Sequence, residues 1–177
     1  TRPLRIATRG SRQALAQSNA VADALRSVTG RSVELVEVNT TGDIRADVAL
    51  HTMGGQGVFV KEVQLAVLDG RADLAAHSAK DLPSTPAEGL VIAAFTRRRD
   101  ARDALIGSTL ADLGEGATVA SGSVRRRAQL RRRRPDLVFA ELRGNIDTRL
   151  SKIPDGGAIV MAVAALQILQ MTERISE

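Results

Sequence analysis

Seven of the ten residues from 125 to 134 are arginine, in the run "RRRAQLRRRR". Ser123 precedes this run and is a suitable N-cap, so we expect a helix over residues 124–134. Basic residues are unfavourable in a first turn, because a helix start already carries partial positive charge. The free backbone N–H groups there, the Ser121 and Ser123 hydroxyls, and the guanidiniums of Arg125 and Arg126 would converge on one point. This combination predicts a binding site for an anion.

The arginines at 131–134 close the same helix, where cations are favourable, and we interpret them as a solvated helix end. A nucleic acid is the alternative ligand for such a cluster. Proteins that bind single-stranded nucleic acids usually place aromatic residues among the basic ones for base stacking, whereas this chain has three Phe and neither Tyr nor Trp. Zinc-finger and basic-zipper spacings are missing as well. We therefore expect a small anion rather than a nucleic acid.

Basic and polar residues recur at other predicted strand ends. Arg143 ends a predicted strand, and Arg149 follows it past a Gly-Asn turn. Arg9, with Ser11, follows the strand-like run "LRIAT". Because α/β proteins bind ligands at the carboxyl ends of parallel strands, this recurrence indicates a small ligand that carries several carboxylates.

The run "HSAKDLP" (77–83) forms a fourth such junction, with Lys80 and Asp81. A carboxylate among cations has a lowered pKa and stays ionised, so Asp81 could accept N–H groups or stabilise a developing cation. The alternative is that Asp81 is only a turn or cap residue before Leu-Pro. We interpret His77 as a packed strand residue, and "GGQG" (54–57) as a hinge or lid that lacks the ending of a phosphate loop.

Strand and helix patterns alternate along the chain, which predicts an α/β fold with mixed, largely parallel sheets flanked by helices. Polar residues at "TTGD" (40–43) predict a turn. The expected strands are at 4–8, 32–38, 72–78, 89–95, 117–121, 137–142 and 158–163. We expect one helix that ends at Gly30, and further helices after "GGQG", at 124–134, near 145–152 and at the C-terminus. The charged stretch "TRRRDARDA" after Phe95 predicts two lobes, residues 1–96 and 97–177.

Composition excludes several classes of site. The chain has no cysteine, which removes disulfides, thiolate catalysis and zinc ribbons, and its two histidines are too few for a histidine-rich metal site. No apolar run approaches the roughly 20 residues of a membrane helix, and the N-terminus lacks the apolar stretch of a signal peptide. We expect a cytoplasmic protein without a metal or a membrane partner.

Six segments, taken in order, resemble the porphobilinogen deaminase (hydroxymethylbilane synthase) family from about residue 4 to the C-terminus. They are "IATRGSRQALAQ", "TTGD", "GVFVKE", "DLAAHSAKDLP", "SVRRRAQL" and "LRGNIDTRLSK". The resemblance implies two lobes similar to two-domain periplasmic-binding-protein-like folds, within a three-domain enzyme of tetrapyrrole (heme) synthesis. That enzyme, a transferase, joins four porphobilinogen molecules head to tail, with loss of ammonia, on a covalently held dipyrromethane cofactor.

The resemblance also implies residue roles. Asp81 would be the catalytic acid, which holds pyrrole N–H groups and stabilises the cation formed as ammonia leaves. The residues that would bind cofactor and substrate carboxylates are Arg9, Ser11, Gln17, Lys80, Ser121, Ser123, Arg125, Arg126, Arg143 and Arg149.

Several departures from the family pattern bear on activity. The family's third domain, which carries the cysteine that anchors dipyrromethane, and the segment that completes the first lobe are both missing. Covalent attachment is not possible in a chain without cysteine. Gln56 stands where lysine is common, "VASGSVRRR" replaces "GTSSLRR", and "AVAALQILQ" replaces a glycine-containing ending.

We therefore expect the chain alone to be inactive and to need a missing domain or chain as its partner. The alternatives are a non-catalytic module that binds polycarboxylate pyrroles and, more distantly, a nucleic-acid-binding protein.

Overall fold

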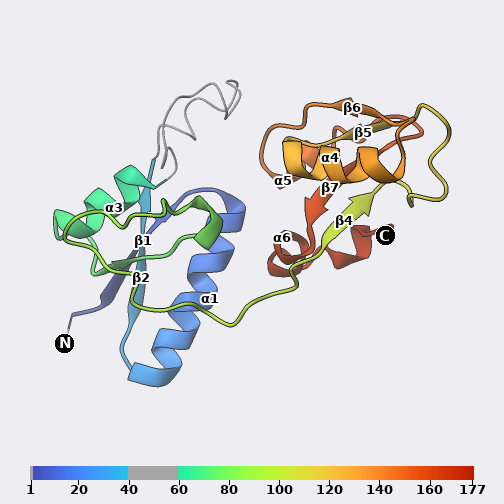
Figure 1. Cartoon of the computed structure of the whole chain (residues 1–177). Helices are drawn as coiled ribbons and strands as arrows, with labels where there is room; N and C mark the ends of the chain where they lie inside the picture. The colour runs from blue at the N-terminus through green and yellow to red at the C-terminus, as the bar shows by residue number, and fades with distance from the viewer. Residues whose placement is uncertain (1, 40–59) are drawn as a thin grey trace. The chain divides into compact units, whose positions relative to one another are not determined.

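A computed structural model of the chain describes residues 2–39 and 60–177 (Figure 1). The chain divides into two compact units, Thr1–Arg97 and Arg98–Glu177, and each unit is described by itself. The predicted turn at 40–43, the "GGQG" loop and Gln56 lie outside the described residues. Within the described residues, no helix is both long enough and apolar enough to cross a membrane.

A three-stranded parallel sheet with the order β2-β1-β3 forms the centre of unit 1. Its strands are β1 (Leu4–Arg9), β2 (Val33–Val38) and the short β3 (Leu74–Ala75). Side chains alternate across a strand, so neighbouring residues of β1 enter two different cores. Ile6 packs with Ala22 of helix α1 (Arg12–Thr29), and Ala7 packs with Val63 of helix α3 (Lys61–Leu68). The sheet is therefore covered by a helix on each face.

Helix α1 ends at Gly30, as the sequence predicts, and Ser11 caps its start. The Ser11 side chain accepts a hydrogen bond from the backbone N–H of Ala14, and Gly30 adopts the left-handed conformation, with φ of 66°. A serine N-cap and a left-handed glycine after the last turn are both common at helix ends. The Ser11 cap places the start of α1 directly after the end of β1.

The second unit holds a mixed four-stranded sheet with the order β4-β7-β5-β6. Its strands are β4 (Asp103–Ile106), β5 (Thr118–Ala120), β6 (Val138–Ala140) and the buried β7 (Ala158–Ala162). β5 runs parallel to β6 and β7, whereas β4 is antiparallel to β7. Helices α4 (Val124–Arg133), α5 (Ile146–Leu150) and α6 (Val163–Ile168) connect or follow these strands. The fold is α/β with largely parallel strand pairing, as the sequence predicts.

The predicted strand at 89–95 is wrong. Residues 91–99 are exposed and have no regular secondary structure, and the exposed fractions of Val91 and Phe95 are 84% and 73%. An apolar run is stable as a strand only when it pairs with a neighbour and buries its side chains, and here the described residues supply neither. The predicted strand at 72–78 is also shorter, because a 3-10 turn, η1 (Ala79–Asp81), soon follows β3.

Candidate functional site

The polar residues of unit 1 gather at the carboxyl edge of its parallel sheet. Arg9 is the last residue of β1, and Ser11 caps the helix that follows. Beyond β3, the Ala76 N–H still donates to the Ala7 carbonyl at 3.1 Å, so the chain runs on beside β1 toward Asp81. Parallel pairing thus brings two junctions that are far apart in sequence to one edge.

Asp81 is a half-buried residue of η1, and its backbone N–H donates to the Ser78 carbonyl at 2.9 Å. The preceding Lys80 is exposed. Gln17 lies on α1, where its Oε1 accepts a hydrogen bond from the Ser78 hydroxyl at 3.0 Å. Gln17 therefore connects α1 to the turn that carries Lys80 and Asp81, a contact that its sequence context does not reveal.

His77 lies on the segment that leads from β3 to η1. Burial lowers the pKa of its imidazole; the Asp81 carboxylate opposes that shift and the Arg9 guanidinium adds to it. Both charges therefore act on the same half-buried ring, outside any strand. Its Nε2 is buried and has no hydrogen-bond partner within the described part of the chain. Sequence reasoning treated His77 as a packed strand residue and missed its place beside Arg9 and Asp81.

In unit 2, a short loop joins β5 to α4 and carries both predicted serines. Ser121 is fully buried, and its hydroxyl accepts a hydrogen bond from the Ser123 N–H at 3.3 Å. Ser123 is the N-cap of α4, as the sequence predicts, and accepts from the Arg126 N–H at 3.5 Å. Arg125 is exposed, whereas Arg126 forms an ion pair with Asp103 at 2.6 Å. One of the two first-turn arginines is therefore already partnered by an acid.

Arg143 precedes α5, and Arg149 lies in the last turn of this helix. Asn145 caps this helix by accepting from the Thr148 N–H at 2.8 Å, and Arg149 Nε donates to the Gly144 carbonyl at 2.8 Å. The side chain of Arg149 is therefore turned back over the Gly-Asn turn that follows Arg143. Arg143 and Arg149 are six residues apart in the sequence, and this bond brings the Arg149 side chain back to the turn beside Arg143.

The charges of two other guanidiniums act on Arg149 at this junction. Burial lowers the pKa of Arg149, and the positive charges of Arg126 and Arg143 lower it further. Among the described residues, no carboxylate forms an ion pair with Arg149. A buried cation that two other cations repel is stabilised when an anion binds to it. The arrangement therefore suits a bound carboxylate.

The later arginines of the α4 run have different surroundings. Arg131 lies over the Phe139 ring at 5.1 Å, and Arg132 and Arg133 are exposed. Arg134 is not a solvated helix end, because it pairs with Asp136 and donates to the carbonyls of Leu110, Leu113 and Gly114. The interpretation of 131–134 as one solvated group thus fails at Arg134, whose partners come from a loop about 20 positions earlier in the sequence.

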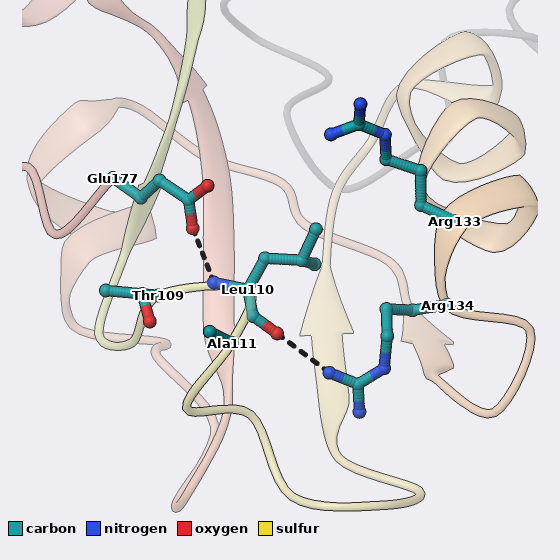
Figure 2. Close-up of a pocket in the computed structure, with 6 residues that line it drawn as sticks. All are labelled: Thr109, Leu110, Ala111, Arg133, Arg134 and Glu177. Carbon is teal, nitrogen blue, oxygen red and sulfur yellow. Dashed lines mark hydrogen bonds between the residues drawn. The ribbon is translucent and has the colours of Figure 1, made fainter.

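Two surface cavities of unit 2 involve the other arginines. Figure 2 shows the first, of about 600 Å³, lined by Thr109, Leu110, Ala111, Arg133, Arg134 and Glu177. Its polar groups already serve the protein: Glu177 accepts from the Leu110 N–H, and Arg134 donates to the Leu110 carbonyl at 2.7 Å (Figure 2). The second, of about 640 Å³, includes the Asp103–Arg126 pair. In the described part of the chain, no cluster of His, Asp or Glu side chains could hold a metal ion.

Comparison with known proteins identifies the family. Residues 4–177 match the model described as "Porphobilinogen deaminase, dipyromethane cofactor binding domain". The chain belongs to the porphobilinogen deaminase family. It is similar to the porphobilinogen deaminase of Acidothermus cellulolyticus, with 49% identity over 179 residues. That alignment covers 98% of this chain and 54% of the relative, so the chain spans about half the length of the curated relative it matches.

Family membership gives a chemical identity to the cofactor that this domain binds, which is a dipyrromethane. The residues present fit such a group, because Arg149 is half-buried, its Nε already donates to the Gly144 carbonyl, and the charges of Arg126 and Arg143 also act on it, which suits a ligand that carries carboxylates. The 177 residues contain no cysteine, so no thiol of this chain can hold it covalently. The structure thus brings Arg9, His77 and Asp81 together in unit 1, and a second basic group together in unit 2.

Proposed function

We propose that this chain is the cofactor- and substrate-binding part of a hydroxymethylbilane synthase of tetrapyrrole (heme) synthesis, a cytoplasmic transferase. Its reaction condenses four porphobilinogen molecules head to tail on a dipyrromethane primer, with release of ammonia. The observation that carries the proposal is the half-buried Arg149, which Arg126 and Arg143 repel and which no carboxylate of the described residues neutralises. An acetate or propionate on a pyrrole supplies the missing negative charge.

The basic group of unit 2 would bind and orient the ligand. Its guanidiniums accept ligand carboxylates by charge-assisted hydrogen bonds, and the first turn of α4 adds Arg125 and the free backbone N–H groups after Ser123. Arg126 releases or shares its bond to Asp103 when a ligand carboxylate arrives. Ser121 is fully buried, so it supports this loop through its bond to Ser123 rather than reaching the ligand.

The groups of unit 1 would serve the chemistry. Asp81 accepts pyrrole N–H groups and stabilises the positive charge that develops on the substrate as ammonia leaves. Arg9, Ser11 and Lys80 bind carboxylates at the same edge of the sheet, and Gln17 holds the turn that carries Asp81. The dipyrromethane, when bound, supplies the growing end to which substrate is added. We propose that residues 1–96 and 97–177 are two lobes of the enzyme.

The second candidate function is a non-catalytic module that binds polycarboxylate pyrroles. The observation that favours it is the lack of any cysteine in the 177 residues, since a primer that is not covalently held is lost with the product. Under either proposal the chain alone does not turn over. Under the enzyme proposal, a partner domain or chain must supply the anchoring thiol.

Titration of the purified chain with porphobilinogen, followed by calorimetry, tests the binding site. We expect Arg149→Gln to weaken binding about tenfold or more, as expected for loss of a charge-assisted hydrogen bond. The control Arg132→Gln makes the same charge change at an exposed position of α4 and leaves the affinity within about twofold. An Arg149→Gln variant that binds as tightly as the unmodified chain would contradict the proposal.

A fusion of the chain to the C-terminal remainder of the Acidothermus enzyme separates the enzyme from the binding module. The enzyme proposal predicts tetrapyrrole absorbance when the fusion is mixed with porphobilinogen. It also predicts that Asp81→Asn abolishes this product while porphobilinogen still binds. A folded fusion that binds porphobilinogen and yields no product favours the non-catalytic module.

A further inference from the structure

Arg127 follows Arg126 on α4, but its guanidinium is used differently. Its Nε donates to the Ser121 carbonyl at 2.7 Å, and its Nη2 forms an ion pair with the Glu141 carboxylate. Ser121 directly follows β5, and Glu141 directly follows β6. One side chain thus connects the loop before α4 to the end of the neighbouring strand.

The loop that Arg127 contacts is closely packed against the segment after β6. The Ser121 N–H donates to the Ala140 carbonyl at 2.9 Å. A Cβ added at Gly122 would lie 2.7 Å from the Leu142 carbonyl oxygen and 3.3 Å from Glu141 Oε1. Glycine is therefore required here because the two backbones approach too closely for a side chain. The Arg127–Glu141 pair closes this contact from the helix side.

The two connected segments lead directly to the basic group of unit 2. The loop 121–123 continues into the first turn of α4 with Arg126, and Glu141 precedes Arg143 by two residues. The separation of these arginines therefore depends on the separation of the two segments. Arg127 is a fourth arginine near these three, and its charge is neutralised by Glu141, an acid of the protein itself.

We propose that Arg127 is a positioning residue for the anion site, and this inference rests on the function proposed above. Its bonds to Ser121 and Glu141 hold the start of α4 against the end of β6, and so set the spacing at which Arg126, Arg143 and Arg149 meet a ligand carboxylate. The role requires arginine, because a guanidinium offers several donors in a fixed plane whereas lysine offers a single charged point. The third arginine of the run is thus structural, while its neighbours are binding groups.

Calorimetric titration of the full 177-residue chain with porphobilinogen tests this role, using Arg127→Lys, Glu141→Gln and the double variant. Each single variant should weaken binding about 5- to 30-fold, in the range of coupling between contacting residues. The double variant should weaken binding no more than the stronger single variant, since both changes break the same connection. Arg132→Lys, at an exposed position of the same helix, should change nothing.

The titrations are made well below the midpoint of thermal unfolding of each variant, where a loss of stability alone leaves the affinity unchanged. Glu141→Gln keeps the Arg127 bond to Ser121 and so provides a folded variant if Arg127→Lys does not fold. Unchanged affinity in Glu141→Gln, with Arg149→Gln weakened, overturns the positioning role and leaves the proposed function standing. Unchanged affinity in Arg149→Gln as well identifies the proposed function as the failure.

Discussion

At the scale of single residues, Thr8 and Ser18 form a hydroxyl pair that connects β1 to α1. Ser18 Oγ donates to Thr8 Oγ1 at 2.6 Å, and both residues are fully buried. Thr8→Val removes the acceptor and leaves a buried hydroxyl with a lost partner, which costs about 1–3 kcal/mol of unfolding free energy. Urea unfolding measures this loss. Thr8→Val/Ser18→Ala should recover part of it, and an unchanged midpoint in Thr8→Val would show that Ser18 finds another acceptor.

The acid behaviour of Asp136 is a second property at this scale. Hydrogen bonds from the Arg134 side chain lower the pKa of Asp136 to about 2. An Asp whose pKa is lower in the folded state stabilises the fold above its ordinary pKa of about 3.9, and loses this contribution as the pH falls from there. Asp136→Asn should therefore be less stable than the unmodified chain at pH 6, and the difference should shrink between about pH 4 and pH 2.

Thermal unfolding at a series of pH values measures the effect of Asp136. The matched control is Asp155→Asn, which removes an exposed carboxylate that forms no bond in the described structure. A difference in unfolding midpoint between Asp136→Asn and the unmodified chain that stays constant down to pH 2 would contradict the ion pair assigned to Asp136 and Arg134.

Arg127 and Arg134 show why residue roles within the arginine run could not be read from the sequence. A cation at a helix end is compatible with solvent, with a ligand or with an acid elsewhere in the protein, and local pattern does not distinguish these. The deciding partners are Glu141 for Arg127 and the carbonyl of Leu110 for Arg134, which come from other segments. Ser123 was predictable as a cap because its partner is the N–H of Arg126, three residues away.

At the scale of elements, the joint between β5 and β7 depends on Gly157. A Cβ at this position would collide with the Thr118 carbonyl oxygen, which belongs to the neighbouring strand. Gly157→Ala should therefore destabilise unit 2 by about 1–3 kcal/mol, as overpacked core substitutions do. Gly114→Ala is the matched control, because its Cβ would meet no atom within 4 Å. Denaturant midpoints of the two variants that agree within error would contradict the predicted collision.

The predicted strands that are present in the structure are those that pair with another strand. Strands 4–8 and 32–38 became the parallel pair β1 and β2, and the apolar face of α1 reached Ile6 through Ala22. The run 89–95 is more apolar than either of them but has no strand partner among the described residues, so it forms no strand and most of it is exposed. Periodicity reports the tendency of a segment, whereas pairing depends on which segments meet in space.

At the scale of the whole molecule, the described chain forms two compact units joined at Arg97 and Arg98. The charged stretch after Phe95 predicts lobes of residues 1–96 and 97–177, because a run of arginines cannot contribute to an apolar core, and this division stays a prediction. Arg9 ends β1 and Arg143 follows β6, and both strands belong to parallel pairs, while the ligand-binding roles of these residues stay predictions.

Limited trypsin digestion tests the exposure of the connection between the units. Residues 97–99 are three exposed arginines without regular secondary structure, whereas Arg131, Arg132 and Arg133 are exposed but lie in α4. Proteases cleave extended, solvent-exposed backbone much faster than helical backbone. Among these six arginines, cleavage at 97–99 should therefore come first, and mass spectrometry of the early fragments identifies it. The triple variant Arg97→Gln/Arg98→Gln/Arg99→Gln should suppress these fragments. Earlier cleavage at 131–133 would contradict the prediction and show that the end of α4 unfolds more readily than the connection is cut.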